Sequence, residues 1–186
     1  MSKNILIISS SPVKDGNSDT LCNKFMEGAI SSGNQVEKIN LREHTINHCR
    51  GCGYCSTTDY NGCCQKDDMA AILDKMLEAD VIVFGTPVYF YAMCGQMKTF
   101  IDRCCARYPK IKDKDFYFLI TAAETDKKML ERTVEEFRGF LDCVEDCKEK
   151  GILYGAGVWK KGEVNNTNYP QQALKWERQR RKRNYV

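Results

Sequence analysis

Near its start the chain reads Lys3-Asn4-Ile5-Leu6-Ile7-Ile8-Ser9-Ser10-Ser11-Pro12-Val13-Lys14-Asp15-Gly16-Asn17-Ser18. The apolar run 3–9, rich in isoleucine, is typical of a strand. A loop of serines, one proline and one glycine follows it, and in 19–31 apolar residues recur at helical spacing. This order of strand, loop and helix predicts the first unit of an α/β domain.

The same alternation continues along the chain. Further strands are expected at 35–41, 79–85, 116–121 and 151–156, and further helices at 67–77, 94–107 and 126–147. Consecutive parallel strands need helical crossovers, which place helices on both faces of the sheet. The predicted fold class is therefore α/β, with a five-stranded parallel sheet.

Length and composition narrow the class of protein. The chain has 186 residues, of which 42% are hydrophobic and 28% charged, as expected for one domain. No apolar run approaches the ~20 residues of a membrane helix, and no signal peptide is recognisable at the N-terminus. The net charge of +3 is too small to indicate nucleic-acid binding. We expect a cytoplasmic protein with neither nucleic acid nor a membrane as partner.

Two loops follow strands at the edge where parallel sheets bind ligands. The loop 9–18 offers hydroxyls, amides, a lysine and a helix N-terminus, which together favour a phosphomonoester. It matches neither GxGxxG nor GxxxxGKS, and an ordinary polar turn capped by Ser18 is the other interpretation. The loop 86–91 carries three aromatic residues that suit a wall for a flat ring, or else pack in the core or in a dimer interface.

Here the sequence resembles a known family. The stretches 9–18, 85–90 and 95–103 resemble the flavodoxin-like NAD(P)H-dependent FMN reductases. The segment Cys49-Arg50-Gly51-Cys52-Gly53-Tyr54-Cys55, followed by Cys63 and Asp67-Asp68-Met69, is similar to the iron–sulfur flavoprotein branch of that family. The resemblance covers roughly residues 3 to 125.

The resemblance implies a doubly wound, flavodoxin-like sheet in the order 2-1-3-4-5 and an FMN-binding domain over 1–157, including a cysteine-rich loop 48–67. Residues 158–186 would be a C-terminal extension of the same domain with a basic helix. The FMN phosphate is expected at Ser9, Ser11, Asn17 and Ser18, with Lys14 as the nearby cation. The ring is expected along Thr86, Pro87, Val88, Tyr89 and Phe90, with Thr121 and Ala122 on its other side. NAD(P)H as co-substrate and a homodimer or homotetramer are also implied.

The spacing of the cysteines can also be interpreted without reference to the family. Cys49, Cys52 and Cys55 have CxxCxxC spacing, and seven residues separate Cys55 from Cys63. Three alternatives stay open: a 4Fe-4S cluster, thiols that oxidise or merely pack, and structural zinc. We expect the segment to be a redox or ligand site near the flavin, at the same edge of the sheet, with Cys64 as a spare thiol. The other six cysteines are expected in helices as small buried residues: Cys22, Cys94, Cys104, Cys105, Cys143 and Cys147.

Three functions compete on these residues. The first is an enzyme that passes electrons from NAD(P)H through FMN to a small-molecule or protein acceptor, for which no acid–base residue is needed. The second is an electron-transfer module in which FMN and a cluster exchange electrons with a ferredoxin-like partner. The third is a flavin-free interaction domain with the same fold. The basic cluster 178–183 is interpreted as a solvated helix end or a subunit contact. An electrostatic contact with an anionic partner, such as the adenosine phosphate of NADPH, is the other alternative.

Overall fold

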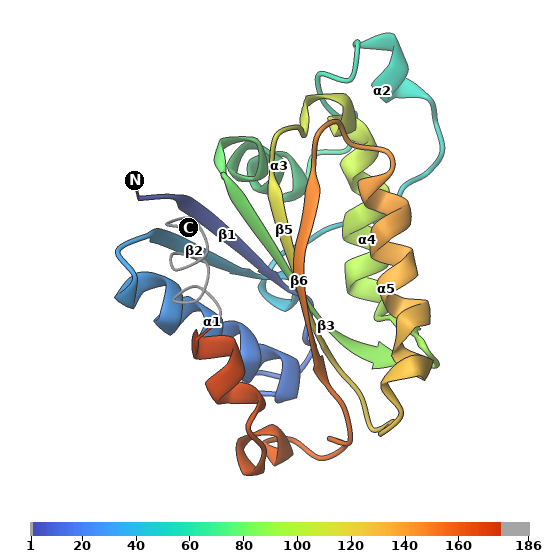
Figure 1. Ribbon diagram of the computed structural model, residues 1–186. Helices are drawn as coiled ribbons and strands as arrows, with labels where there is room; N and C mark the ends of the chain where they lie inside the picture. The colour runs from blue at the N-terminus through green and yellow to red at the C-terminus, as the bar shows by residue number, and fades with distance from the viewer. Residues whose placement is uncertain (1, 176–186) are drawn as a thin grey trace.

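A computed structural model describes residues 2–175, and its centre is a parallel sheet (Figure 1). The strands of this sheet are β1 (Asn4–Ser9), β2 (Gln35–Asn40), β3 (Val81–Tyr89), β5 (Asp115–Thr121) and β6 (Lys148–Gly155). They lie in the order β2-β1-β3-β5-β6, and each neighbouring pair is parallel. With the short β4 set aside, this is the predicted order 2-1-3-4-5, so the fold class is confirmed.

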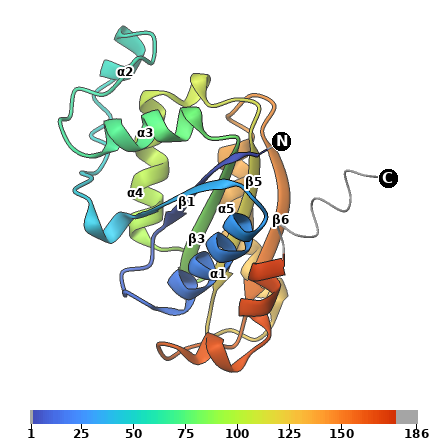
Figure 2. The same ribbon diagram turned by 90° about the vertical axis from the view of Figure 1, so that its left-hand side faces the viewer.

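Helices cover both faces of this sheet, as expected (Figures 1 and 2). One face carries α3 (Met69–Glu78), α4 (Gly95–Arg103) and α5 (Lys127–Leu141), and the other carries α1 (Asn17–Ser31). The four-residue helix α2 (Tyr54–Thr57) lies apart from both layers, within the cysteine segment. Short 3-10 turns occupy Leu41–Glu43, Cys104–Ala106, Tyr108–Lys110 and Glu163–Asn166. None of the helices within residues 2–175 is long and apolar enough to span a bilayer.

The central strand β3 builds a core on each side. Alternate side chains of a strand point to opposite faces, so Ile82 and Phe84 pack under α3, α4 and α5 while Val81 and Val83 pack under α1. On the first side the rings of Phe118 and Phe137 stack with centroids 4.6 Å apart. Because both faces are covered, the strand needs no polar residue, which is why it was readable from the sequence.

The strand β3 runs further than the sequence predicted. It continues through Pro87 to Tyr89 and pairs antiparallel with β4 (Ala92–Met93). Phe90 and Tyr91 make the turn with φ of 52° and 62°. Two-residue hairpins of this kind usually carry asparagine or glycine, so two aromatics gave no recognisable hairpin signal. Tyr89 thus ends the strand β3, and Phe90 and Tyr91 form the turn.

Two helices are shorter than predicted. The helix α4 ends at Arg103 and α5 ends at Leu141 instead of reaching 107 and 147. Three of the six cysteines expected in the core are therefore misplaced: Cys105 and Cys143 are exposed, and Cys147 is half-buried. Cys22, Cys94 and Cys104 are buried as predicted.

The chain after β6 packs back onto α1 (Figure 2). Val158, Val164 and Ala173 join the core on the α1 side, and residues 169–175 are helical. The predicted basic cluster 178–183 lies outside the described residues. At the closest approach, a Cβ added to Gly28 would lie 2.1 Å from the carbonyl oxygen of Leu174.

The close contact between Gly28 and Leu174 provides a test of whether the C-terminal segment packs against α1. Replacing Gly28 by alanine forces the Leu174 backbone away, and overpacking of this kind costs about 1–3 kcal/mol. The matched control is Gly139→Ala in α5, where an added Cβ meets nothing within 4 Å, so helix propensity should stabilise the protein by roughly 0.5–1 kcal/mol. Urea unfolding measures both free energies of unfolding. Equal stability of the two variants would show that the C-terminal segment does not press on α1.

Candidate functional site

A cleft of about 280 Å³ lies at the carboxyl edge of the sheet. Four segments line it: the loop after β1, the carboxyl ends of β3 and β5, and the loop after β6. Its lining residues are Ser11, Val13, Gly16, Asn17, Ser18, Pro87, Val88, Tyr89, Thr121, Ala122, Ala123, Val158, Trp159 and Lys161. Open α/β sheets bind ligands at this edge, where the strand order reverses.

The loop after β1 presents a helix N-terminus to the cleft. Ser11 Oγ donates to Val13 O at 2.9 Å, and Gly16 N closes a turn on Val13 O at 3.0 Å. Among residues 2–175 no side chain caps α1, so its first backbone N–H groups are available to a ligand. Ser18 is 1% exposed, yet its hydroxyl has no hydrogen-bond partner among residues 2–175. This arrangement fits a phosphate, which would accept from both kinds of donor.

A buried ion cluster supports the same loop from below. Asp19 accepts from Ser9 Oγ at 3.2 Å and from Asp15 N at 2.9 Å, and it pairs with Lys38 and Arg42. Burial would raise the pKa of Asp19, but the Lys38 hydrogen bond and the Asp15 N–H outweigh it and lower that pKa. Arg42 also pairs with the Glu43 carboxylate at 3.0 Å, so the cluster balances two cations with two carboxylates. Its part is to hold the loop in place.

The side-chain amide of Asn17 holds the loop after β6 in place beside the cleft. Its Nδ2 donates to Lys160 O at 3.0 Å and its Oδ1 accepts from Val164 N at 3.2 Å. On the other side, Val158 N donates to Ala122 O at 2.8 Å. The predicted phosphate contact by the Asn17 side chain therefore competes with a structural role, because both ends of its amide are engaged.

The loop after β6 brings Trp159 and Lys161 to the cleft, and neither was predicted from the sequence. Glu163 Oε2 accepts from Trp159 N at 2.7 Å and from Lys160 N at 2.9 Å, and these two N–H groups are the main cause of the lowered pKa of Glu163. The Trp159 side chain is 80% exposed. The signal was available: Trp-Lys-Lys comes soon after the last strand, whose carboxyl end must lie at the ligand edge.

Four predicted flavin contacts lie outside the cleft lining. Ser9 and Thr86 are fully buried beneath it, and Thr86 Oγ1 accepts from Cys94 N at 3.2 Å. Lys14 lies at the tip of the Val13–Gly16 turn, so Lys161 is the lysine that lines the cleft. Phe90 is fully exposed and lines an adjoining cleft, which shares Val88, Ala122, Ala123 and Trp159 with the first.

The cysteine segment is clamped at its base by Arg103. Its guanidinium forms two bonds to the Asp67 carboxylate, at 2.7 and 3.0 Å, and one to Asn47 O at 2.6 Å. Both side chains of this ion pair are at most 2% exposed. Burial alone would raise the pKa of Asp67, but bonds from Arg103, Asn47 N and Met69 N lower it to about 2. The clamp closes the loop 48–66 against α4.

The prediction that this segment lies at the carboxyl edge of the sheet is wrong. The rings of Tyr60 and Tyr108 lie 5.1 Å apart, and Lys110 Nζ donates to Asn61 Oδ1 at 2.8 Å. Residues 108–110 lead into the amino end of β5, so α2 lies at the opposite end of the sheet from the β1–α1 loop (Figure 1). The reason is α4, about 13 Å long. The residues after β2 lie beside its first turns, and Asn47 bonds Arg103 at its far end.

The cysteines form a contact pair and no assembled metal site. Cys52 Sγ and Cys64 Sγ are 3.7 Å apart, whereas Cys55 and Cys63 are half-buried against the core and Cys49 is exposed. Burial, followed by neighbouring thiols, raises the pKa of Cys55 to about 11. Within residues 2–175 no three Cys, His, Asp or Glu side chains take up a metal-binding arrangement. The predicted ligand set does not fit a cluster or zinc as placed here.

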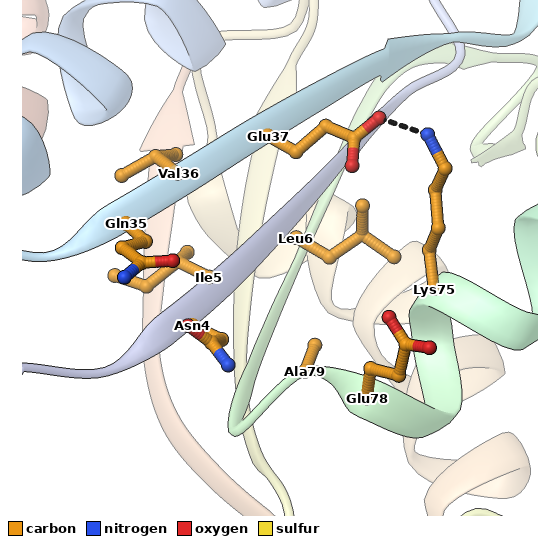
Figure 3. Close-up of a pocket in the computed structure, with 9 residues that line it drawn as sticks. All are labelled: Asn4, Ile5, Leu6, Gln35, Val36, Glu37, Lys75, Glu78 and Ala79. Carbon is orange, nitrogen blue, oxygen red and sulfur yellow. Dashed lines mark hydrogen bonds and ion pairs between the residues drawn. The ribbon is translucent and has the colours of Figure 1, made fainter.

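A second hollow, of about 290 Å³, lies at the amino ends of β1 and β2 beside α3 (Figure 3). Lys75 and Glu37 on its rim form an ion pair with each other. Their charges are thereby neutralised, and none of the predicted site residues lines this hollow. The cleft at the carboxyl edge is therefore the candidate site.

Comparison with known proteins shows the family of the chain. Residues 3–144 match the family model of the NADPH-dependent FMN reductases. An iron-sulfur flavoprotein of Archaeoglobus fulgidus is 32% identical over 139 residues, which are 74% of this chain and 60% of that protein. A second one from the same organism is 41% identical over 99 residues, 53% of this chain and 47% of its own. The chain thus spans about half to three fifths of these curated relatives.

A solved structure shows the same fold. The NAD(P)H:quinone oxidoreductase from Methanothermobacter marburgensis superposes with a TM-score of 0.74 at 18% identity, covering 95% of this chain and 96% of that one. Family model, curated relatives and fold agree with the residues that pointed to a flavodoxin-like reductase. The chain belongs to the NADPH-dependent FMN reductase family, on the branch whose curated members are the iron–sulfur flavoproteins.

Proposed function

We propose that the protein binds FMN in the cleft at the carboxyl edge and is an NAD(P)H-dependent oxidoreductase that uses the flavin to pass electrons to a small-molecule or protein acceptor. The observation that carries this proposal is the hydroxyl of Ser18, which lines the cleft without a hydrogen-bond partner among residues 2–175, at the uncapped N-terminus of α1. A phosphate there would satisfy the hydroxyl and the helix N–H groups together. Membership of the FMN reductase family supports it independently.

The walls of the cleft suggest how each residue contributes. Ser18 and Lys161 would bind the phosphate, together with Ser11 once its hydroxyl turns away from the Val13 carbonyl. Asn17 would hold the Lys161 loop in place. Pro87, Val88 and Tyr89 would lie along one side of the ring, with Thr121 and Ala122 opposite. Bound FMN supplies the hydride and electron chemistry. The chain's own part is to bind the phosphate, position the ring and exclude water from one side.

Two finer features belong to the same proposal. Exposed aromatic side chains surround the cleft mouth: Tyr89, Phe90, Tyr91 and Trp159. A contiguous aromatic surface of this kind favours a subunit contact, so we propose a homodimer or homotetramer that covers it. All eleven cysteines are free thiols, which favours a reducing compartment such as the cytoplasm.

Reconstitution tests the proposed activity. Titration of the flavin-free protein with FMN, followed by flavin fluorescence, should saturate at one FMN per chain. Oxidation of NADH or NADPH, followed by absorbance, should then require added FMN and an acceptor. A protein that binds no FMN, or that oxidises NAD(P)H equally well without it, would rule the proposal out. Light scattering with multi-angle detection gives the oligomeric state in the same buffer.

A further inference from the structure

The thiols of Cys52 and Cys64 lie in direct contact at the surface of the cysteine segment. Their sulfurs are 3.7 Å apart, and both residues are exposed. A disulfide needs an S–S distance of about 2.05 Å, so the two sulfurs need only a short movement toward each other to form one. Arg50 Nη2 lies 3.7 Å from Cys64 Sγ, which puts a cation beside the pair.

The backbone around the pair is free to make that approach. Cys52 lies between Gly51 and Gly53, which have φ of 62° and 71°, and Gly62 precedes the Cys63-Cys64 pair with φ of 147°. An added Cβ would meet nothing within 4 Å at any of the three glycines. Movement here disturbs no packed neighbour, and the Arg103–Asp67 clamp holds the base of the segment independently.

The remaining thiols of the segment are placed differently. Cys55 and Cys63 pack against the core, and Cys63 Sγ accepts from Gln65 N at 3.4 Å. Cys64, which does not belong to the CxxCxxC set or its predicted fourth position, is the one that touches Cys52. The two thiols that touch are therefore not a pair from the predicted ligand set, and their contact needs its own chemical explanation.

We propose that Cys52 and Cys64 are a redox-active dithiol that forms a reversible disulfide by exchange with a low-molecular-weight disulfide such as oxidised glutathione. The Cys52 thiolate attacks one sulfur of that disulfide, the S–S bond breaks, and one small thiolate leaves. Cys64, after losing its proton, attacks the Cys52 sulfur of the mixed disulfide and displaces the second small thiolate. Two protein thiols are oxidised, and one small disulfide is reduced to two thiols. The site lies at the far edge from the FMN cleft and does not depend on the proposed flavin function.

Mass spectrometry of the full chain tests the proposal. The protein is incubated with oxidised glutathione under nitrogen, the remaining thiols are blocked with N-ethylmaleimide, and intact masses and tryptic peptides are measured. We expect the loss of two alkylatable thiols, a peptide in which Cys52 is joined to Cys64, and full reversal by dithiothreitol.

Two matched variants separate the pair from its neighbours. Cys63→Ser should form the same cross-link, because the Cys63 sulfur accepts from Gln65 N and is not part of the contact between Cys52 Sγ and Cys64 Sγ. Cys64→Ser should stop at one glutathione adduct on Cys52, because the resolving thiol is missing. Thermal unfolding establishes that both variants are folded before oxidation.

Two results would overturn the proposal. One is a cross-link from Cys52 to a cysteine other than Cys64, or no cross-link in the folded protein. The other is stoichiometric iron or zinc in anaerobically purified protein that survives in Cys64→Ser and is lost in Cys63→Ser, because Cys52 would then serve the predicted metal set.

Discussion

Replacing Arg103 by methionine is expected to destabilise the protein by about 3–5 kcal/mol, because it leaves the buried Asp67 carboxylate without its partner. The Asn47 carbonyl loses its donor in the same variant, so the base of the cysteine segment opens. Urea unfolding gives the free energy of unfolding, and limited proteolysis between residues 48 and 66 reports the opening. The wild-type loop should resist cleavage at its base.

The matched control is Arg107→Met in the neighbouring turn. Arg107 pairs with Asp74, but that carboxylate is 55% exposed, and exposed pairs contribute about 0–1 kcal/mol. A similar loss of stability in both variants would contradict a special role for the buried pair.

The same clamp predicts how stability depends on acid. The folded-state pKa of Asp67 is about 2, below its ordinary value of 3.8. A lowered pKa means that the stabilisation is fully present above pH 3.8 and is lost as the pH falls through about 2. Asp67→Asn should reduce the free energy of unfolding at neutral pH and flatten its decline over that acid range. An unchanged acid profile would contradict the assignment.

Replacing Ser18 by aspartate is expected to weaken FMN binding strongly. The new carboxylate would face the FMN phosphate, and like charges in contact cost several kcal/mol, so affinity should fall roughly a hundredfold or more. An acidic residue in the first turn of α1 interacts favourably with the helix dipole, which offsets part of the cost of placing a carboxylate at a position that is 1% exposed. Thermal unfolding of the flavin-free variant checks that it is folded.

Two further variants calibrate that result. Ser18→Ala removes one hydrogen bond to a charged group, and its loss should be roughly tenfold. Ser56→Asp adds the same charge on α2, at the far edge of the sheet, and should leave FMN affinity unchanged. If Ser18→Asp binds FMN as tightly as Ser56→Asp, the phosphate does not lie at the N-terminus of α1.

The sheet was predictable because its signals are local. An apolar run such as 81–84 needs no knowledge of distant residues to be recognised as a buried strand. Helix ends were less predictable, because the apolar spacing continues past Leu141. No local sequence pattern indicates that Cys143 and Cys147 lie outside α5. The turn at Phe90 and Tyr91 was missed because its left-handed backbone is imposed by the pairing of β3 with β4.

The candidate site was predictable only where a single strand and its loop form it. Ser11, Ser18 and the 87–89 stretch follow from the rule that ligands lie at the carboxyl edge. The wall formed by Trp159 and Lys161 depends on bonds between Asn17 and residues 160 and 164, across most of the chain. Likewise, Arg103 sets the path of the cysteine segment by pairing with Asp67, and no sequence pattern predicts that pair.

The most direct test of the FMN site compares FMN with riboflavin, which lacks the phosphate, in the wild type and in Lys161→Ala. If Lys161 pairs with the phosphate, the variant should bind FMN roughly tenfold or more weakly and should bind riboflavin as the wild type does. Lys14→Ala serves as the control and should change neither affinity, because Lys14 lies outside the cleft lining. Equal losses for both flavins, or no loss for FMN, would contradict the placement of the phosphate between α1 and the loop after β6.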